Sequence, residues 1–130
     1  MSRAENAHAA MVVHNANCAQ NTIAAFDDVG IDKETALKIT LGFGGGLGGS
    51  GSVCGAVIAA YMLLGLKLPL DPAAPKKHRE KINAQIAEFN KQFLARHHSL
   101  ICSELKASPS GQDSCPNLVK SAVEIVEGLS

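Results

Sequence analysis

Four residues of this 130-residue sequence carry the most distinctive chemistry, and all four are cysteines: Cys18, Cys54, Cys102 and Cys115. Each stands where a helix is predicted to begin, within a turn of a capping residue, a proline or the start of an apolar run. A helix N-terminus presents unpaired N–H groups and partial positive charge, which stabilise a thiolate over a thiol. Because the thiolate is both the nucleophile and the metal ligand, these positions favour redox or metal chemistry over burial as small hydrophobes.

The spacing of the cysteines excludes the familiar local motifs. They lie 36, 48 and 13 positions apart, and neither CxxC nor CxxCH occurs. Zinc-ribbon, thioredoxin-type and c-type haem sites are therefore not indicated, and any shared site must be assembled by the fold.

Three chemistries remain open for such a site. We favour four thiolates that bind an iron–sulfur cluster or another metal for electron transfer, because Cys₄ ligation is the ordinary arrangement for such clusters. The first alternative is a thiol–disulfide protein in which Cys54 is the attacking thiolate, although the sequence does not choose among the three pairings. The second is a structural zinc or interaction module without catalysis. In each case we expect Cys18, Cys54 and Cys102 to converge on one pocket, with Cys115 nearby on a flexible loop.

Residues 42–52 form a glycine-rich loop that contains seven of the 12 glycines. Its formal GxGxxG match does not predict a dinucleotide site, since no strand precedes it and no acidic residue follows at the required distance. The loop is either a nest of N–H groups for an anion or for cluster sulfides, or a tight crossing of two backbones. Under the first interpretation, five glycines are predicted to bind a cofactor: Gly44, Gly45, Gly46, Gly48 and Gly49.

The sequence predicts helices around these residues, and no period-2 strand pattern occurs. Helices are predicted over residues 4–13, 18–29, 33–41, 54–65 and 76–97, over a short turn at Cys102 that Ser99 can cap, and from Cys115 onward. The segment after Cys54 is apolar on every face and should be the central, most buried helix. We therefore predict one all-α domain over residues 1–130: a compact bundle of about six helices around a central apolar helix preceded by the glycine-rich loop.

Composition narrows the class of protein. Lys+Arg and Asp+Glu both count 12, so the formal charge of zero argues against nucleic-acid binding and eases self-association, and we expect a homodimer. The longest uncharged apolar run, Val53 to Leu66, has 14 residues and falls short of the ~20 that a membrane helix needs. Residues 1–17 do not form a secretory signal. The sequence therefore predicts a soluble cytoplasmic protein, in which cysteines serve as redox groups or metal ligands more often than as disulfides.

The chain also resembles a known family. The segment NCAQNTIAAF, the glycine-rich loop that runs into VCGAVIAA, the later CSEL and a cysteine before an amphipathic helix are similar to the C-GCAxxG-C-C family of redox-active proteins. The resemblance runs from about Ala4 to Gly128 and matches the family's four cysteines. Ala59 stands where the motif has its last Gly and keeps that helix face small. The resemblance implies a redox protein or an accessory of an oxidoreductase, with an iron–sulfur cluster in some members; it supplies no mechanism, and the redox partner stays unknown.

Overall fold

The computed structural model describes residues 1–13 and 16–129, and over these residues the protein is all-α, as predicted. The break predicted after the first helix begins at residues 14–15, which lie outside the described part. The helices are α1 (Arg3–Val13), α2 (Cys18–Ala24), α3 (Lys33–Thr40), α4 (Gly44–Leu47), α5 (Gly55–Lys67), α6 (Pro75–His97), α7 (Cys102–Lys106) and α8 (Cys115–Gly128). The short 3-10 helices η1 (Leu41–Phe43) and η2 (Gly111–Asp113) precede α4 and α8.

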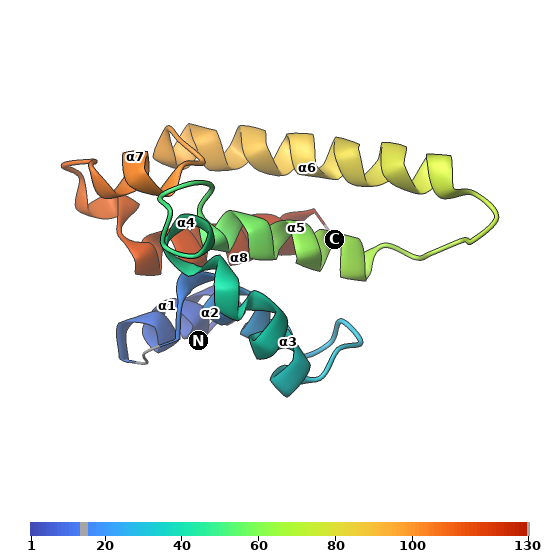
Figure 1. The fold of residues 1–130 in the computed structure, drawn as a ribbon, viewed down its shortest axis with the longest axis horizontal. Coiled ribbons are helices and arrows are strands. Elements are labelled where there is room, and N and C mark those ends of the chain that lie inside the picture. Colours follow the sequence, from blue (N-terminus) through green and yellow to red (C-terminus); the bar gives the residue numbers. More distant parts are fainter. Residues whose placement is uncertain (14–15, 130) are drawn as a thin grey trace.

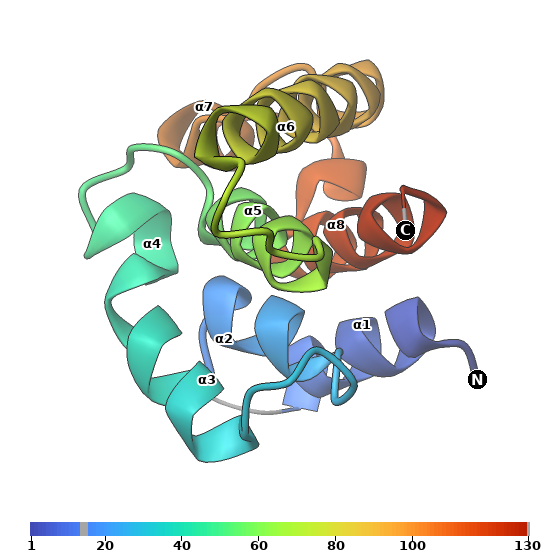
Figure 2. The same ribbon diagram turned by 90° about the vertical axis from the view of Figure 1, so that its right-hand side faces the viewer.

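The helices stack in three layers, which are visible in Figures 1 and 2. The long helix α6 forms one outer layer, α5 and α8 form the middle layer, and α1, α2 and α3 form the other outer layer. The glycine-rich loop and α7 lie together at one end of this stack (Figure 1). That end is where the first turns of α5, α7 and α8 meet.

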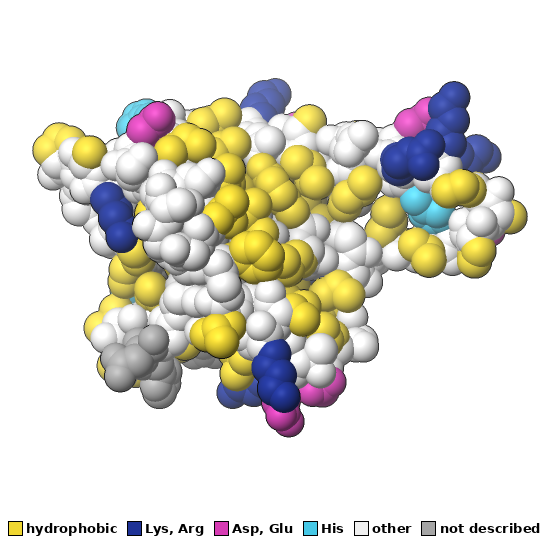
Figure 3. All heavy atoms as spheres, in the orientation of Figure 1, with side chains coloured by type: hydrophobic (Ala, Val, Ile, Leu, Met, Phe, Trp, Pro, Cys, Tyr) yellow, Lys and Arg dark blue, Asp and Glu magenta, His cyan; other side chains and the backbone are white. Residues whose placement is uncertain are grey.

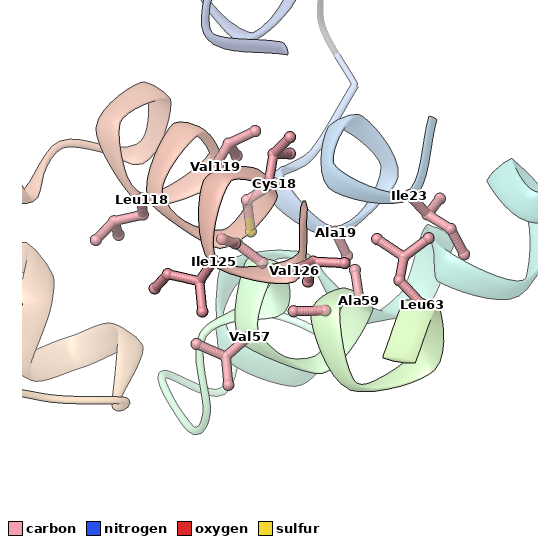
Figure 4. Close-up of a cluster of buried hydrophobic side chains, with 14 of the residues drawn as sticks. Cys18, Ala19, Ile23, Val57, Ala59, Leu63, Leu118, Val119, Ile125 and Val126 are labelled. Carbon is pink, nitrogen blue, oxygen red and sulfur yellow. The ribbon is translucent and has the colours of Figure 1, made fainter. Parts of the chain in front are cut away.

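Helix α5 has the central position that its sequence predicts. Val57 and Leu63 have no exposed surface, and Ile58 and Met62 are half-buried at the edge of the core. Alanines on this helix, such as Ala59 and the fully buried Ala56, let α2 and α8 approach closely. Figure 4 shows the buried side chains of α2, α5 and α8 in one cluster. Because the core has few aromatic residues, small side chains that pack closely together fill it in place of large rings.

The sequence predicts Asn17 and Asp32 as the N-caps of α2 and α3, and both caps are confirmed. Asn17 Oδ1 accepts the N–H of Gln20 at 2.8 Å, and Gln20 Oε1 accepts the N–H of Asn17 at 3.1 Å, which completes a capping box. Asp32 Oδ2 accepts the N–H of Thr35 at 3.0 Å. The first residues of α2 are thus held by hydrogen bonds that the sequence itself encodes.

The predicted end of the second helix is wrong. We expected it at Gly30, but α2 ends at Ala24, and the following residues turn so that Phe26 and Val29 are buried. Asp27 and Asp28 would place two negative charges in the last turn of a longer helix, where the helix dipole disfavours them. Asp28 instead pairs with Arg3 at 3.3 Å.

The outer helix α6 packs on the middle layer through stacked aromatic rings. Phe89 and Phe93 are fully buried with ring centroids 5.7 Å apart, and Tyr61 of α5 meets Phe89 edge-on. Leu94, one turn after Asn90 on the same helix, is 40% exposed. In Figure 3, Lys and Arg side chains gather where α6 begins, and hydrophobic side chains gather over the middle of the same face. No helix in the described part of the chain has the length and hydropathy to span a membrane.

Candidate functional site

All four cysteines stand at helix N-termini, as predicted. Cys18, Cys102 and Cys115 are the first residues of α2, α7 and α8, and Cys54 is the N-cap residue of α5. Pro116 occupies the first turn of α8, where its missing N–H costs no hydrogen bond. The four thiols therefore lie where backbone N–H groups remain free to act as donors.

One cavity of about 450 Å³ reaches all four cysteines. Its walls come from α1, α2, the glycine-rich loop, α5, α7 and the segment that leads into α8. The other lining residues are Met11, Asn17, Gly45, Leu105, Lys106, Ser108, Ser110, Asp113, Ser114 and Leu118. Residues far apart in the sequence are thus assembled by the fold around one space.

Cys18 is the cysteine whose thiolate is best stabilised. Its sulfur accepts a hydrogen bond from the thiol of Cys54 and further ones from the N–H groups of Gly45, Ala56 and Ala19. These four donors, with Cys54 the strongest, outweigh burial and lower the pKa of Cys18 to about 6. Cys18 is only 7% exposed, and Figure 4 shows it among the buried side chains of the core. A buried thiolate at the N-termini of both α2 and α5 follows from this arrangement.

Cys54 has the opposite character. Donation of its proton to Cys18, burial and the negative charge of Cys18 all raise the pKa of the Cys54 thiol, while the N–H groups of Val57 and Ala56 act weakly against them. The expectation that Cys54 is the attacking thiolate stays a prediction, and the donors around the pair favour the charge on Cys18 instead. Sequence position alone places both residues at a helix start and does not rank them.

Backbone hydrogen bonds join the segment that leads into Cys54 to the segment that leads into Cys102. Cys54 N–H donates to the carbonyl of Leu100 at 2.7 Å, and Cys102 N–H donates to the carbonyl of Ser52 at 2.6 Å. Between these bonds, Val53 and Ile101 form an isolated antiparallel bridge. Cys54 and Cys102 each directly follow one of the two bridged residues.

Cys115 is the most accessible of the four thiols, being half-buried where the other three are buried. Burial raises the pKa of Cys115, the charges of Cys18 and Cys102 raise it further, and the ammonium group of Lys106 lowers it. These influences show that Cys115 lies within electrostatic reach of two other cysteines.

The glycines expected to bind a cofactor divide into three kinds. Gly45 lines the cavity and donates its N–H to Cys18. Gly46 marks a tight crossing, since a Cβ there would lie 2.6 Å from Cβ of Cys102, and Gly44 is crowded in the same way by Asn17. Gly48 and Gly49 do not line the cavity, and their positive φ angles of 68° and 77° serve the turn. The loop is thus both an N–H donor and a backbone crossing.

Sequence reasoning missed one glycine of the site, Gly55. A Cβ at this position would lie 2.3 Å from the carbonyl oxygen of Phe43 and 2.8 Å from the sulfur of Cys18. Only a residue without a side chain lets the first turn of α5 meet both groups. The signal was the Cys-Gly-Ala order itself, because Gly is unfavourable in a helix unless close contact requires it.

A buried polar network beside the cavity was also missed. His97 Nδ1 lies 2.8 Å from Asp113 Oδ1, and His97 Nε2 lies 2.7 Å from Ser121 Oγ. Ser108 donates to Asp113 Oδ2 at 2.6 Å, and the bonds from Ser108 and His97 keep the pKa of Asp113 below its ordinary value. Ser121 is buried inside α8, so this Ser-His-Asp arrangement does not meet a substrate. Its effect is to fix the segment that precedes Cys115.

The metal-ligand set expected from the sequence stays a prediction. Among residues 1–13 and 16–129, no three His, Cys, Asp or Glu side chains are grouped so that they could hold a metal ion. The four cysteines share a cavity without forming a ready coordination shell.

Comparisons with known proteins place the chain in a family. No curated protein and no solved structure shows significant similarity to it. Residues 16–129 match a family described as "putative redox-active protein", whose motif contains four cysteines. The match begins just before Cys18 and includes the whole glycine-rich loop and all four cysteines. The chain therefore belongs to the C-GCAxxG-C-C family of redox-active proteins.

Proposed function

We propose that the protein is a thiol–disulfide redox protein whose working pair is Cys18 and Cys54. The observation that carries this proposal is the placement of two buried cysteines at the first turns of α2 and α5, where both line one cavity and a Cβ on Gly55, next to Cys54, would lie 2.8 Å from the Cys18 sulfur. The Cys54 thiol and the N–H groups of Gly45, Ala56 and Ala19 lower the pKa of Cys18 and so favour its thiolate. A thiolate beside a protonated thiol is the reduced form that thiol–disulfide exchange requires. The cavity of about 450 Å³ gives a small disulfide access to the pair.

The reaction proceeds by two exchanges. The Cys18 thiolate attacks one sulfur of a substrate disulfide, forms a mixed disulfide and expels the other half of the substrate as a thiolate. Cys54 then attacks the sulfur of Cys18, forms the Cys18–Cys54 disulfide and releases the second half. The proton of Cys54 passes to a leaving thiolate, so two protein thiols are oxidised while one substrate disulfide is reduced to two thiols.

The coupling between the two cysteines gives these steps their order. While Cys18 is a thiolate, its charge and its hydrogen bond raise the pKa of Cys54 and keep it protonated. Once Cys18 is in the mixed disulfide, its hydrogen bond and its charge no longer raise the pKa of Cys54; burial still raises it, and the N–H groups of Val57 and Ala56 lower it. Cys54 is thus a better nucleophile when there is a mixed disulfide to resolve.

The test is to react the reduced protein with oxidised glutathione and to map the products by mass spectrometry without reductant. Wild type should yield the Cys18–Cys54 disulfide. Cys54→Ser should instead accumulate glutathione on Cys18, and Cys18→Ser should react far more slowly, whereas Cys102→Ser should still form the pair. The proposal fails if Cys18 stays unmodified in the wild type, or if Cys54→Ser does not trap the mixed disulfide.

A second candidate is an iron–sulfur cluster or a zinc ion bound in the same cavity. It is favoured by one observation, the convergence of four cysteines from four helices on one space. The described side chains do not form a ligand set as they stand, so binding would require the cavity walls to close around the metal. Anaerobic purification followed by metal analysis and a visible spectrum separates this candidate from the first: a stoichiometric metal supports it, and a colourless, metal-free protein with reversible thiols argues against it.

A further inference from the structure

Accessibility separates Cys115, which is half-buried, from the other three thiols, which are buried. Cys18 and Cys54 are 7% and 3% exposed, so a bulky reductant has no direct route to a disulfide between them. Cys115 is half-buried and lines the same cavity, as does Cys102. An inner pair that small disulfides oxidise therefore needs a path by which a large reductant restores it.

We propose that Cys102 and Cys115 form an outer dithiol that takes over the disulfide from the Cys18–Cys54 pair and presents it to a dithiol protein at the surface. This inference rests on the proposed function, and it assigns the second pair of cysteines and the class of reductant.

The exchange balances in two steps. Cys115, having lost its proton, attacks the sulfur of Cys18 in the inner disulfide, forms Cys18–Cys115 and releases Cys54, which takes up that proton. Cys102 then attacks the sulfur of Cys115, forms Cys102–Cys115 and releases Cys18 as a thiolate, and the proton of Cys102 goes to solvent. The partner's dithiol reduces the outer disulfide through Cys115 and is itself oxidised to a disulfide, so two electrons move inward.

The positions of the outer cysteines suit these steps. The bridge between Val53 and Ile101 holds the residues before Cys54 and Cys102 side by side, and both cysteines line the cavity. Gly46, packed against Cys102, keeps that residue at the cavity wall. Cys115 follows Asp113, whose carboxylate is held at 2.8 Å by His97 and at 2.6 Å by Ser108. The segment before Cys115 is thus held by hydrogen bonds, where we had expected a flexible loop.

The charges around Cys115 favour exchange in the oxidised state. Burial and the charges of Cys18 and Cys102 oppose a thiolate at Cys115, and the ammonium group of Lys106 favours one. When Cys18 enters the inner disulfide its charge disappears and Lys106 remains. Cys115 is therefore a better nucleophile when an inner disulfide is present to be attacked.

The experiment starts from protein that carries only the Cys18–Cys54 disulfide, made with one equivalent of oxidised glutathione. Samples are quenched with an alkylating reagent over time, and disulfides are mapped by mass spectrometry. In wild type, Cys102–Cys115 should appear at a rate independent of protein concentration. Cys102→Ser should instead accumulate Cys18–Cys115. The inference is overturned if the wild-type protein keeps only the inner disulfide, or if the outer one forms at a rate that rises with protein concentration.

A second arm tests the direction of access. A dithiol immobilised on beads, too large to enter the cavity, should reduce the wild type at least tenfold faster than Cys115→Ser, while soluble dithiothreitol should reduce both at similar rates. Equal rates with the beads would overturn the role of Cys115. Absence of a Cys18–Cys54 disulfide at the outset would instead count against the proposed function, so the two failures are distinct.

Discussion

Helix α5 carries a glycine in its first turn and another in its last, and the two have opposite surroundings. A Cβ on Gly55 would collide with the carbonyl oxygen of Phe43 and with the sulfur of Cys18. A Cβ on Gly65 would meet nothing within 4 Å. The same residue type is thus required by close contact at one end of the helix and is free to change at the other.

The difference extends to the electrostatics of the two ends. At the first turn, the N–H group of Ala56 donates to the Cys18 sulfur, so the positive end of the helix faces a thiolate. At the last turn, Lys67 stands at the negative end with its ammonium group 5.1 Å from the ring centre of Phe26. Packing is tight at the first turn of α5, which contacts the Cys18 sulfur, and loose at its last turn. The comparison indicates that the constraint on this helix comes from the cysteine site.

The largest effect is expected from Gly55→Ala. Adding a Cβ 2.3 Å from a backbone oxygen forces α5 away from the loop and should lower the unfolding free energy by about 3 kcal/mol. It should also weaken the donors to Cys18 and so raise the pKa of that thiol toward its ordinary value. Denaturant unfolding measures the first effect, and the pH dependence of alkylation measures the second.

Gly65→Ala is the matched control on the same helix. Because Ala has the higher helix propensity and finds open space there, this variant should gain about 0.5–1 kcal/mol with an unchanged thiol titration. If both variants lose stability equally, the contrast between the two ends of α5 is wrong.

The next effect is the pH dependence of Cys18. With a pKa of about 6 in the folded protein and about 8.5 in an unfolded chain, the unfolded state binds more protons between these values. The unfolding free energy should therefore rise with pH from about 6 to about 8.5, and at pH 7 the thiolate fraction should be about 30-fold that of an ordinary thiol. Above that range the raised pKa of Cys54 reverses the sign.

This rise should be absent in Cys18→Ser and retained in Cys115→Ser. Thiolate ultraviolet absorbance against pH gives the titration, and urea unfolding at several pH values gives the stability. A titration in wild type with its only midpoint above 8 would contradict the thiolate assignment of Cys18.

How far the site could be predicted depends on the range of the interactions that build it. Asn17, Asp32 and Pro116 act on their own helix ends, so they marked α2, α3 and α8 and placed cysteines at N-termini. The ranking of Cys18 over Cys54 depends on N–H donors from a distant loop, and no local pattern contains that information. Such donors become neighbours only when the fold brings them together.

The His97 network is intermediate between these two cases. Its members are separated in the sequence and share no motif, yet Ser121 lies on the apolar face of α8, where a polar residue requires a buried partner. That requirement predicts a partner without naming it. The end of α2 was missed for a similar reason, because the burial of Phe26 is decided by tertiary packing.

A smaller effect is expected from Asp113→Asn, which keeps the shape of the residue and removes its charge. Asp113 accepts from both His97 and Ser108, so the loss should cost about 2 kcal/mol of unfolding free energy. Because the segment before Cys115 is then less firmly held, Cys115 should be alkylated faster while Cys18 keeps its rate. Ser110→Ala, which removes an exposed bond to the Gln112 N–H, is the control and should change neither. Equal alkylation of Cys115 in Asp113→Asn and wild type would show that the network does not position this residue.

The smallest effect concerns the last turn of α5, around Gly65, and tests whether this surface is free in solution. Leu66 beside Gly65 is 41% exposed, and the chain has no net charge to oppose association. We expect a two-fold homodimer that covers this end, with a mass in light scattering near twice 13.5 kDa at high concentration. Leu66→Gln should shift the equilibrium toward monomer, whereas Leu70→Gln in the connection to α6 should not. A second copy on this surface would also reduce the gain from Gly65→Ala, because the space around Gly65 would then be filled. A monomeric mass at every concentration would refute the dimer and leave the contrast between the two glycines at its full size.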